Sequence, residues 1–284
     1  MSRKQEIKTN SQTKNKRNKK DTDSALLTYG GHLEVLRQML FRILGVAGTI
    51  AILIFCFKKT TWLVLMAPSE WDFCTYRWIE SVLQLVNADF HFNEFHVDMI
   101  ATDLSSQFMT HISTSVYLGL LGASPYILYE LFRFISPALY ENERKYSVQV
   151  TSIIYLLFIF GVLMSYFVIF PISFRFLGTY SVSAKVVSNI TLDSYISTFV
   201  SLTLVMGVVF QLPVIAFFLG KMEVISSFML AKYRKHSLIV IMLVAAIITP
   251  PDLMTLILVT IPLYMLYEVS IRVVKIVERN IEEI

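Results

Sequence analysis

Six long apolar runs, separated by short polar breaks, constrain the fold of this chain more than any other feature. The runs extend over Phe41–Phe57, Phe108–Phe132, Val148–Phe170, Tyr195–Leu219, His236–Thr249 and Leu253–Ile271. A helix needs about 20 apolar residues to cross the hydrocarbon core of a bilayer. Because lipid offers backbone groups no hydrogen-bond partners, spans without strand-like alternation have to be helical. The sequence therefore predicts an all-α, polytopic membrane protein with six transmembrane helices.

The composition excludes a soluble globular protein. Hydrophobic residues make up 55% of the 284 residues, and charged residues make up 16%. A soluble domain usually has about 45–50% apolar and about 25% charged residues. Since too few charges remain to cover a water-exposed surface, most of the surface has to face lipid.

Lysine and arginine residues fall mainly on one side of the predicted bundle. The side that holds the N-terminus, residues 133–147, residues 220–235 and the C-terminus has 20 of them, and the other side has 5. Cytoplasmic segments of membrane proteins carry an excess of these residues. We therefore expect both termini in the cytoplasm.

The chain divides into three parts. Residues 1–24 contain eight Lys/Arg and no aromatic residue, so we expect a disordered basic cytoplasmic tail. Residues 25–279 are expected to form the six-helix membrane domain, with an external segment at about 58–107, and residues 280–284 a C-terminal tail. Tryptophans in the external segment are typical of interfacial anchors, and a short amphipathic helix is predicted on the outer surface around Trp71–Val86.

Motifs for catalysis and cofactor binding are missing from the sequence, so we expect neither an enzyme nor a cofactor. The two cysteines exclude a disulfide scaffold and a cysteine-based zinc site. His91 and His96 lie near acidic residues, but their spacing fits no recurrent metal site. Ser124 and His236 could be combined into a protease dyad, although a Gly-Ala-Ser patch in a membrane helix more often serves close helix packing.

Gln211 is the deepest polar side chain in the predicted spans, about 12 Å from the end of its helix at Leu219. It either bonds a backbone carbonyl freed by Pro213, which has no N–H to donate, or contacts another transmembrane helix. The sequence leaves both interpretations open.

The last two spans are unusual. The fifth, His236–Thr249, has 14 residues, which span about 21 Å, less than the roughly 30 Å hydrocarbon core. Pro262 is expected to interrupt the sixth. Between them, the sequence Thr249-Pro250-Pro251-Asp252 stops one helix and places Asp252 to cap the next.

Several segments occur in an order that is typical of one family of membrane proteins. They are His32–Arg37, which is similar to the motif H-L-x-E-L-R, and Tyr129–Arg144, Ser165–Pro171, Phe210–Val214, Thr249–Asp252 and Ile261–Glu268. With six spans and both termini inside, the chain resembles the TatC family, the multi-spanning core of the twin-arginine protein translocase. The resemblance extends from about Gly31 to Arg279, except in most of the external segment.

The resemblance implies a concave, glove-like fold that binds the signal peptides of folded precursor proteins at its cytoplasmic face. Recognition would depend on two adjacent arginines of the signal peptide. By the match of the first cytoplasmic loop, Glu143 would meet this arginine pair, and Phe134, Pro137 and Arg144 would shape the site. Arg37 matches the arginine of the first motif.

The chain departs from the family pattern at two positions. Val35 occupies the place of a second carboxylate, and Glu34 lies next to it, about 100° around a helix. Glu34 can substitute only if the start of the helix is rotated or frayed. Gln211 stands where a glutamate is frequent. Its side chain can still form hydrogen bonds, but it has no ionisable group.

The resemblance also implies several partners. These are TatA-like and TatB-like single-span membrane proteins, twin-arginine signal peptides, the lipid bilayer and further copies of the chain, without nucleic acid. A partner helix is expected to dock near Gln211 and Thr249. The expected location is the bacterial cytoplasmic (inner) membrane, with export driven by the proton-motive force.

Two other functions compete with the translocase. A six-span small-solute transporter would need polar groups that meet at mid-membrane, often in two repeated halves. The sequence has no such repeat and only Gln211 at depth. A purely structural membrane anchor would leave the acidic turn around Glu143 unexplained.

Overall fold

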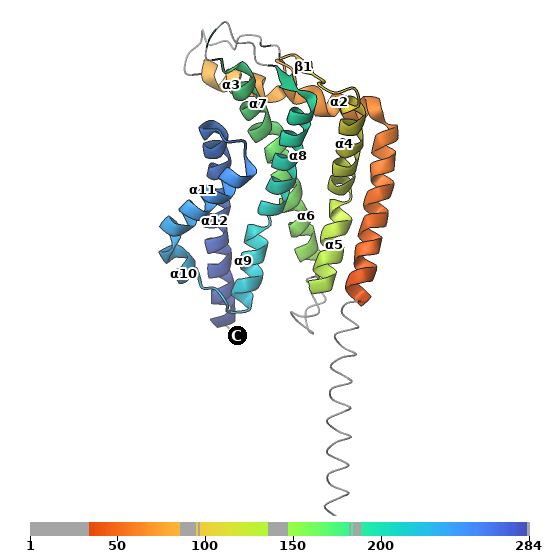
Figure 1. Cartoon of the computed structure of the whole chain (residues 1–284). Helices are drawn as coiled ribbons and strands as arrows, with labels where there is room; N and C mark the ends of the chain where they lie inside the picture. Colours follow the sequence, from red (N-terminus) through yellow and green to blue (C-terminus); the bar gives the residue numbers. More distant parts are fainter. Residues whose placement is uncertain are drawn as a thin grey trace, which may run out of the picture.

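A computed structural model describes residues 34–85, 95, 97–135, 147–181, 183 and 189–282 of the chain. The predicted basic tail lies outside these residues. Figure 1 shows long helices running side by side, with a layer of short helices across one end. The first described helix begins, and α12 ends, at the opposite end of the bundle, as an even number of crossings requires.

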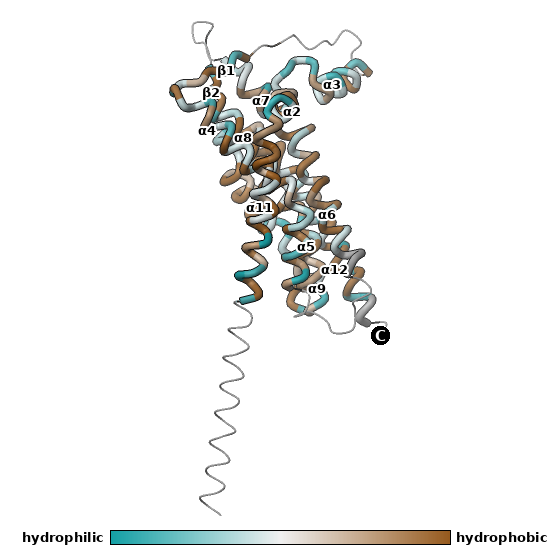
Figure 2. Tube along the Cα trace, turned by 90° about the vertical axis from the view of Figure 1, so that its right-hand side faces the viewer, coloured by the Kyte–Doolittle hydropathy of each residue, from teal (hydrophilic) through white to brown (hydrophobic). Residues whose placement is uncertain are grey.

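The described elements are almost entirely helical. In chain order they are the first helix (Glu34–Cys56), α2 (Lys58–Met66), η1 (Ala67–Ser69), α3 (Cys74–Gln84), β1 (Met99–Ile100), α4 (Ser106–Gly122), α5 (Ser124–Ile135), α6 (Ser147–Met164), the π-helical turn η3 (Ser165–Ile169), α7 (Phe170–Thr179), β2 (Ile190–Thr191), α8 (Leu192–Val209), α9 (Leu212–Lys221), α10 (Ser227–Lys232), α11 (Arg234–Ile248) and α12 (Leu253–Glu282). Figure 2 shows hydrophobic residues along the length of the bundle helices. The predicted all-α membrane fold is confirmed.

Four of the described helical stretches are long and apolar enough to cross a membrane on their own. They are Glu34–Cys56, Thr151–Thr179, Leu192–Lys221 and Leu253–Arg279. The predicted second span is divided at Ala123 into α4 and α5, but hydrogen bonds from Ala123 N to Gly119 O and from Ile127 N to Ala123 O connect the two pieces. The predicted short fifth span appears as α11, with 15 residues.

The predicted interruption of the sixth span at Pro262 is wrong. Helix α12 continues through Pro262 as one helix of 30 residues. A proline inside a helix removes one backbone hydrogen bond. Since α12 packs along both α9 and α11, tertiary contacts hold the helix together across this missing bond.

The layer across the outer end consists of α2, η1 and α3, here called the cap. The predicted amphipathic surface helix is found as α3, Cys74–Gln84. The hydroxyl of Tyr76 donates to Pro68 O at 3.0 Å and to Pro171 O at 2.8 Å. Burial raises the pKa of the Tyr76 hydroxyl, because the charged phenolate is disfavoured away from water. Tyr195 fastens the cap at a second point, donating to Leu65 O at 2.7 Å.

One pairing was not predicted from the sequence. Strands β1 and β2 pair in parallel, with Met99 opposite Ile190 and Ile100 opposite Thr191. Strands of two residues have no periodicity that a sequence pattern can reveal. The pair ties the external segment to the start of α8.

We predict that Tyr76→Phe lowers the midpoint of thermal unfolding of the detergent-solubilised protein. The substitution removes the hydroxyl donor from two buried prolyl carbonyl oxygens, and such a loss costs about 1–3 kcal/mol. Tyr180→Phe is the control, because Tyr180 is 61% exposed. Equal midpoints for Tyr76→Phe and the unmodified protein would contradict the fastening role of this hydroxyl.

Candidate functional site

The structure describes five of the eight residues that the sequence singled out for binding. Glu34 and Arg37 lie at the start of the first helix, Phe134 near the end of α5, Gln211 between α8 and α9, and Thr249 at the end of α11. The remaining three residues, Pro137, Glu143 and Arg144, fall in the segment between α5 and α6 that lies outside the described residues.

The start of the first helix presents an exposed carboxylate. Glu34 Oε1 lies 3.3 Å from Arg37 Nη2 and accepts a hydrogen bond of 3.2 Å from Gln38 Nε2. The side chains of Arg37 and Glu34 are 68% and 49% exposed. An exposed ion pair of this kind contributes about 0–1 kcal/mol. An incoming guanidinium can therefore displace Arg37 from Glu34 at little cost.

Helix α5 carries a buried carboxylate, Glu130, one turn before Phe134. It accepts a hydrogen bond of 3.0 Å from the Tyr126 hydroxyl and lies 3.7 Å from the Arg42 guanidinium on the first helix. Glu130 is not among the site residues predicted from the sequence. The available signal was an ionisable residue inside an apolar run, which is expensive to bury and often functional.

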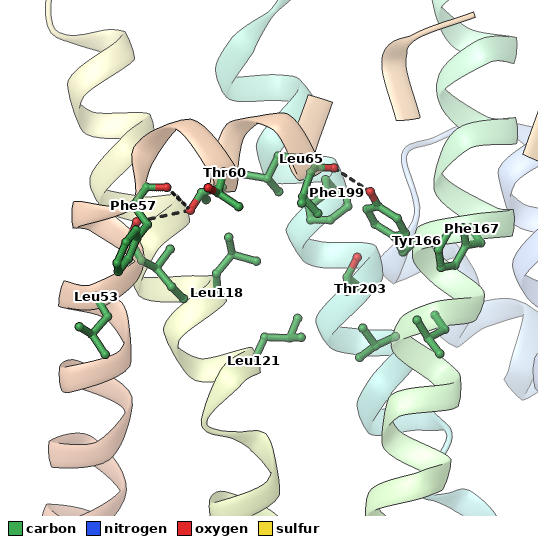
Figure 3. Close-up of a pocket in the computed structure, with 15 residues that line it drawn as sticks. Leu53, Phe57, Thr60, Leu65, Leu118, Leu121, Tyr166, Phe167, Phe199 and Thr203 are labelled. Atoms are coloured by element: carbon green, nitrogen blue, oxygen red, sulfur yellow. Dashed lines mark hydrogen bonds between the residues drawn. The ribbon is translucent and has the colours of Figure 1, made fainter. Parts of the chain in front are cut away.

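A cavity of about 580 Å³ lies beneath the cap, between the first helix, α4, α6, η3 and α8. Figure 3 shows the side chains that surround it. Its lining is apolar apart from the hydroxyls of Thr60, Thr61, Thr203 and Tyr166. The apolar lining residues are Leu53, Ile54, Phe57, Val64, Leu65, Leu118, Leu121, Val162, Leu163, Phe167 and Phe199. These properties suit an apolar chain rather than a small polar solute.

Hydrogen bonds to backbone carbonyls hold α2 in place at the outer end of this cavity. Tyr166, which also lines the cavity, donates from its hydroxyl to Val64 O on α2 at 2.7 Å. Thr61 donates to Phe57 O at 3.1 Å, where the first helix ends and α2 begins. The hydroxyls in the lining are therefore partly used by the protein itself, which leaves the cavity more apolar than its composition indicates.

Gln211 stands at the break between α8 and α9 and bonds a neighbouring helix. Its Nε2 donates to Ile154 O on α6 at 3.0 Å. Of the two interpretations of the sequence, contact with another transmembrane helix is therefore found within this chain, and the carbonyl is not one that Pro213 frees. The Oε1 atom of Gln211 is buried without a hydrogen-bond partner among the described residues.

Thr249 ends α11 with its hydroxyl already used. Its Oγ1 donates to Ala245 O at 3.0 Å, and the residue is 6% exposed. Asp252 Oδ1 accepts from Thr255 N at 2.7 Å, so the predicted cap of α12 is confirmed. Any partner helix at this end of α11 would meet exposed apolar side chains such as Ile247, which is 78% exposed.

The residues considered for catalysis do not assemble into a catalytic site. Ser124 is 3% exposed, and its Oγ has no hydrogen-bond partner among the described residues. His236 is exposed, with its ring 5.7 Å from that of Tyr233. Within the described ranges no three metal-ligating side chains gather in one place, and His91 and His96 lie outside them.

Comparisons with known proteins identify the family. The family model described as "Sec-independent protein translocase protein (TatC)" matches residues 31–262. The TatC protein of Blattabacterium is 35% identical over 84% of this chain and 92% of its own length. The TatCy protein of Bacillus subtilis is 35% identical over 64% of this chain and 72% of its own length.

The fold agrees with solved structures of the same family. A crystal structure described as "Twin Arginine Translocase Receptor- TatC" has a TM-score of 0.68 and 29% sequence identity, and the match covers 87% of this chain and 99% of that one. The TatC fold has six spans, so the divided α4–α5 pair and the short α11 count as crossings beside the four long helices. The chain therefore belongs to the TatC family, as a multi-pass membrane component of the twin-arginine protein translocase and not an enzyme.

Proposed function

We propose that this chain is the receptor that binds the twin-arginine signal peptides of folded precursors at the cytoplasmic face of the bacterial inner membrane. The observation that carries the proposal is the pairing of an exposed carboxylate, Glu34, at one end of the first helix with an apolar cavity toward the other end. The end of the bundle that holds Glu34 is assigned to the cytoplasm because lysine and arginine are in excess on that side.

The two parts of this site match the two parts of a signal peptide. Leu53, in the cavity lining, is nineteen residues beyond Glu34, which is about 28 Å along a helix. A signal peptide that places its arginines at the inner end can extend its apolar segment along the bundle toward the cavity. An apolar segment of roughly nine extended residues, or twice as many in a helix, covers that distance.

The apolar segment has to supply most of the affinity. Micromolar binding needs about 8 kcal/mol, whereas an exposed ion pair supplies about 0–1 kcal/mol. The carboxylates of Glu143 and Glu34 then supply discrimination, because a guanidinium offers a planar, bidentate donor fork and the lysine ammonium does not. Phe134, Pro137 and Arg144 complete the arginine-binding site in this proposal.

The same receptor recruits single-span TatA-like and TatB-like partners, and further copies of itself, for export driven by the proton-motive force. A partner helix near Gln211 would contact the exposed side chains of Val208 and Ile215, which are 63% and 51% exposed, rather than the buried Oε1 atom of Gln211. Exposed apolar residues on α11 support docking beside Thr249, with Ile247 and Leu243 78% and 62% exposed.

We predict that the purified receptor captures a reporter with a twin-arginine signal peptide and loses it when both arginines are replaced by lysines. The charge of the peptide is the same in both cases, so the loss would report recognition of the guanidinium group. Co-purification from detergent measures the capture. Equal capture of the two reporters would refute the proposed function.

We predict that Glu143→Ala abolishes export of twin-arginine precursors while the protein still accumulates in the membrane. The substitution removes the carboxylate expected to meet the arginine pair. Glu141→Ala is the matched control, because it removes the same charge two residues away in the sequence. Export of a periplasmic reporter is the readout. Normal export by Glu143→Ala, or an equal loss in both variants, would remove Glu143 from the site.

We predict that a cysteine at Ile247 forms a crosslink with the transmembrane helix of a single-span partner. Cys56 and Cys74 are first replaced by serine, since both are exposed. A cysteine at Leu163, which lines the cavity, is the control and should not react with the partner. If the cysteine at Ile247 gives no partner crosslink in membranes, docking at α11 is wrong.

A further inference from the structure

Glu130, Arg42 and Tyr126 form a polar cluster at the inner end of the bundle. The Glu130 side chain is 8% exposed, and its Oε1 lies 3.7 Å from Arg42 Nη1. The Tyr126 hydroxyl donates to the same oxygen at 3.0 Å. A carboxylate inside an apolar span is expensive to bury unless it is paired. The cluster satisfies this requirement by joining two helices that are distant in sequence, the first helix and α5.

The first helix needs such a connection, because little of it is buried. Only 11% of the most apolar 18-residue stretch of this helix is buried inside the protein. In its middle, a Cβ added to Gly119 of α4 would come within 2.6 Å of Ala51 Cβ, so the two backbones pack closely there. Near its outer end, the ring of Phe55 stacks on His111 at 4.4 Å. Arg42 and Glu130 supply the corresponding contact at the inner end.

The inner contact lies next to both segments of the proposed arginine-binding site. Arg42 follows Glu34 by eight residues, about 12 Å along the helix. Glu130 precedes Phe134 by four residues, about 6 Å along α5. Because both segments continue directly from the paired residues, the separation of Arg42 and Glu130 sets the separation of Glu34 from the end of α5.

We propose that Glu130, Arg42 and Tyr126 are positioning residues that hold the two segments of the arginine-binding site at the correct separation. The inference rests on the proposed function. The distance of 3.7 Å is within ion-pair range but beyond a normal hydrogen bond. The attraction therefore acts through charge, which a pair of reversed charges can restore. Tyr126 fixes the position of the carboxylate and does not itself touch the signal peptide.

The test measures the affinity of the full-length receptor in nanodiscs for a reporter that carries a twin-arginine signal peptide. Removing Arg42 leaves the buried Glu130 carboxylate uncompensated, and removing Glu130 breaks the link between the first helix and α5. We expect a loss of at least about tenfold for Glu130→Gln and for Arg42→Gln. The exchanged pair, Arg42→Glu with Glu130→Arg, should recover most of this loss. Tyr126→Phe should give a smaller, severalfold loss.

A distance measurement separates positioning from a general loss of stability. Spin labels on cysteines at Gln38 of the first helix and Leu131 of α5, in a background without Cys56 and Cys74, report the separation of the two segments. The distance distribution should broaden in Glu130→Gln and narrow again in the exchanged pair. The control is Arg234→Gln, which breaks the 2.7 Å ion pair with Glu268 between α11 and α12. It should leave both the affinity and the distance unchanged.

The outcomes distinguish this inference from the proposed function. If the unmodified receptor does not prefer paired arginines over paired lysines, the proposed function fails. If it does, but Glu130→Gln binds within twofold and keeps the distance distribution, the positioning role is wrong. Should Glu130→Gln fail to accumulate, Arg42→Gln and the exchanged pair decide, because Arg42 is half exposed. An exchanged pair that accumulates but binds no better than Arg42→Gln also overturns the proposal.

Discussion

Backbone groups at the breaks between helices have to find partners within the protein, because the surrounding lipid offers none. At several breaks between the described helices, side chains form hydrogen bonds to the backbone. Asp252 caps the start of α12, and the amide of Gln211 spans from the α8–α9 break to a carbonyl of α6. Thr75 of the cap donates to Phe167 O in the π-helical turn η3. The bonds from Gln211 and Thr75 also connect neighbouring elements of the bundle.

The need to pair backbone carbonyl groups also positions α2 at the outer end of the apolar cavity. The hydroxyls of Tyr166 and Tyr195 donate to carbonyl oxygens of α2, so the cap is held to η3 and α8 by bonds that cross between elements. The cavity therefore depends on the attachment of the cap to the bundle and not on any one helix. This arrangement gives the proposed receptor a preformed apolar surface at a fixed distance from Glu34.

Exposure determines what each carboxylate at the inner end can do. Glu34 is half exposed and forms a solvent-exposed ion pair with Arg37. An incoming arginine can therefore replace Arg37 as the partner of Glu34. Glu130 is buried, and removing its partner would leave an uncompensated charge in an apolar setting. Glu34 is thus suited to binding and Glu130 to holding two helices together, although both residues are glutamates.

The sequence by itself determined the features that depend on a few neighbouring residues. It predicted the membrane spans, the short α11, the amphipathic α3 and the Asp252 cap, because length, apolar composition and capping act locally. Only the tertiary structure decided that α12 continues through Pro262, that Gln211 bonds Ile154, and that Arg42 meets Glu130. These outcomes depend on which helices become neighbours, since a hydrogen bond or ion pair between spans requires two distant segments to come within a few ångströms.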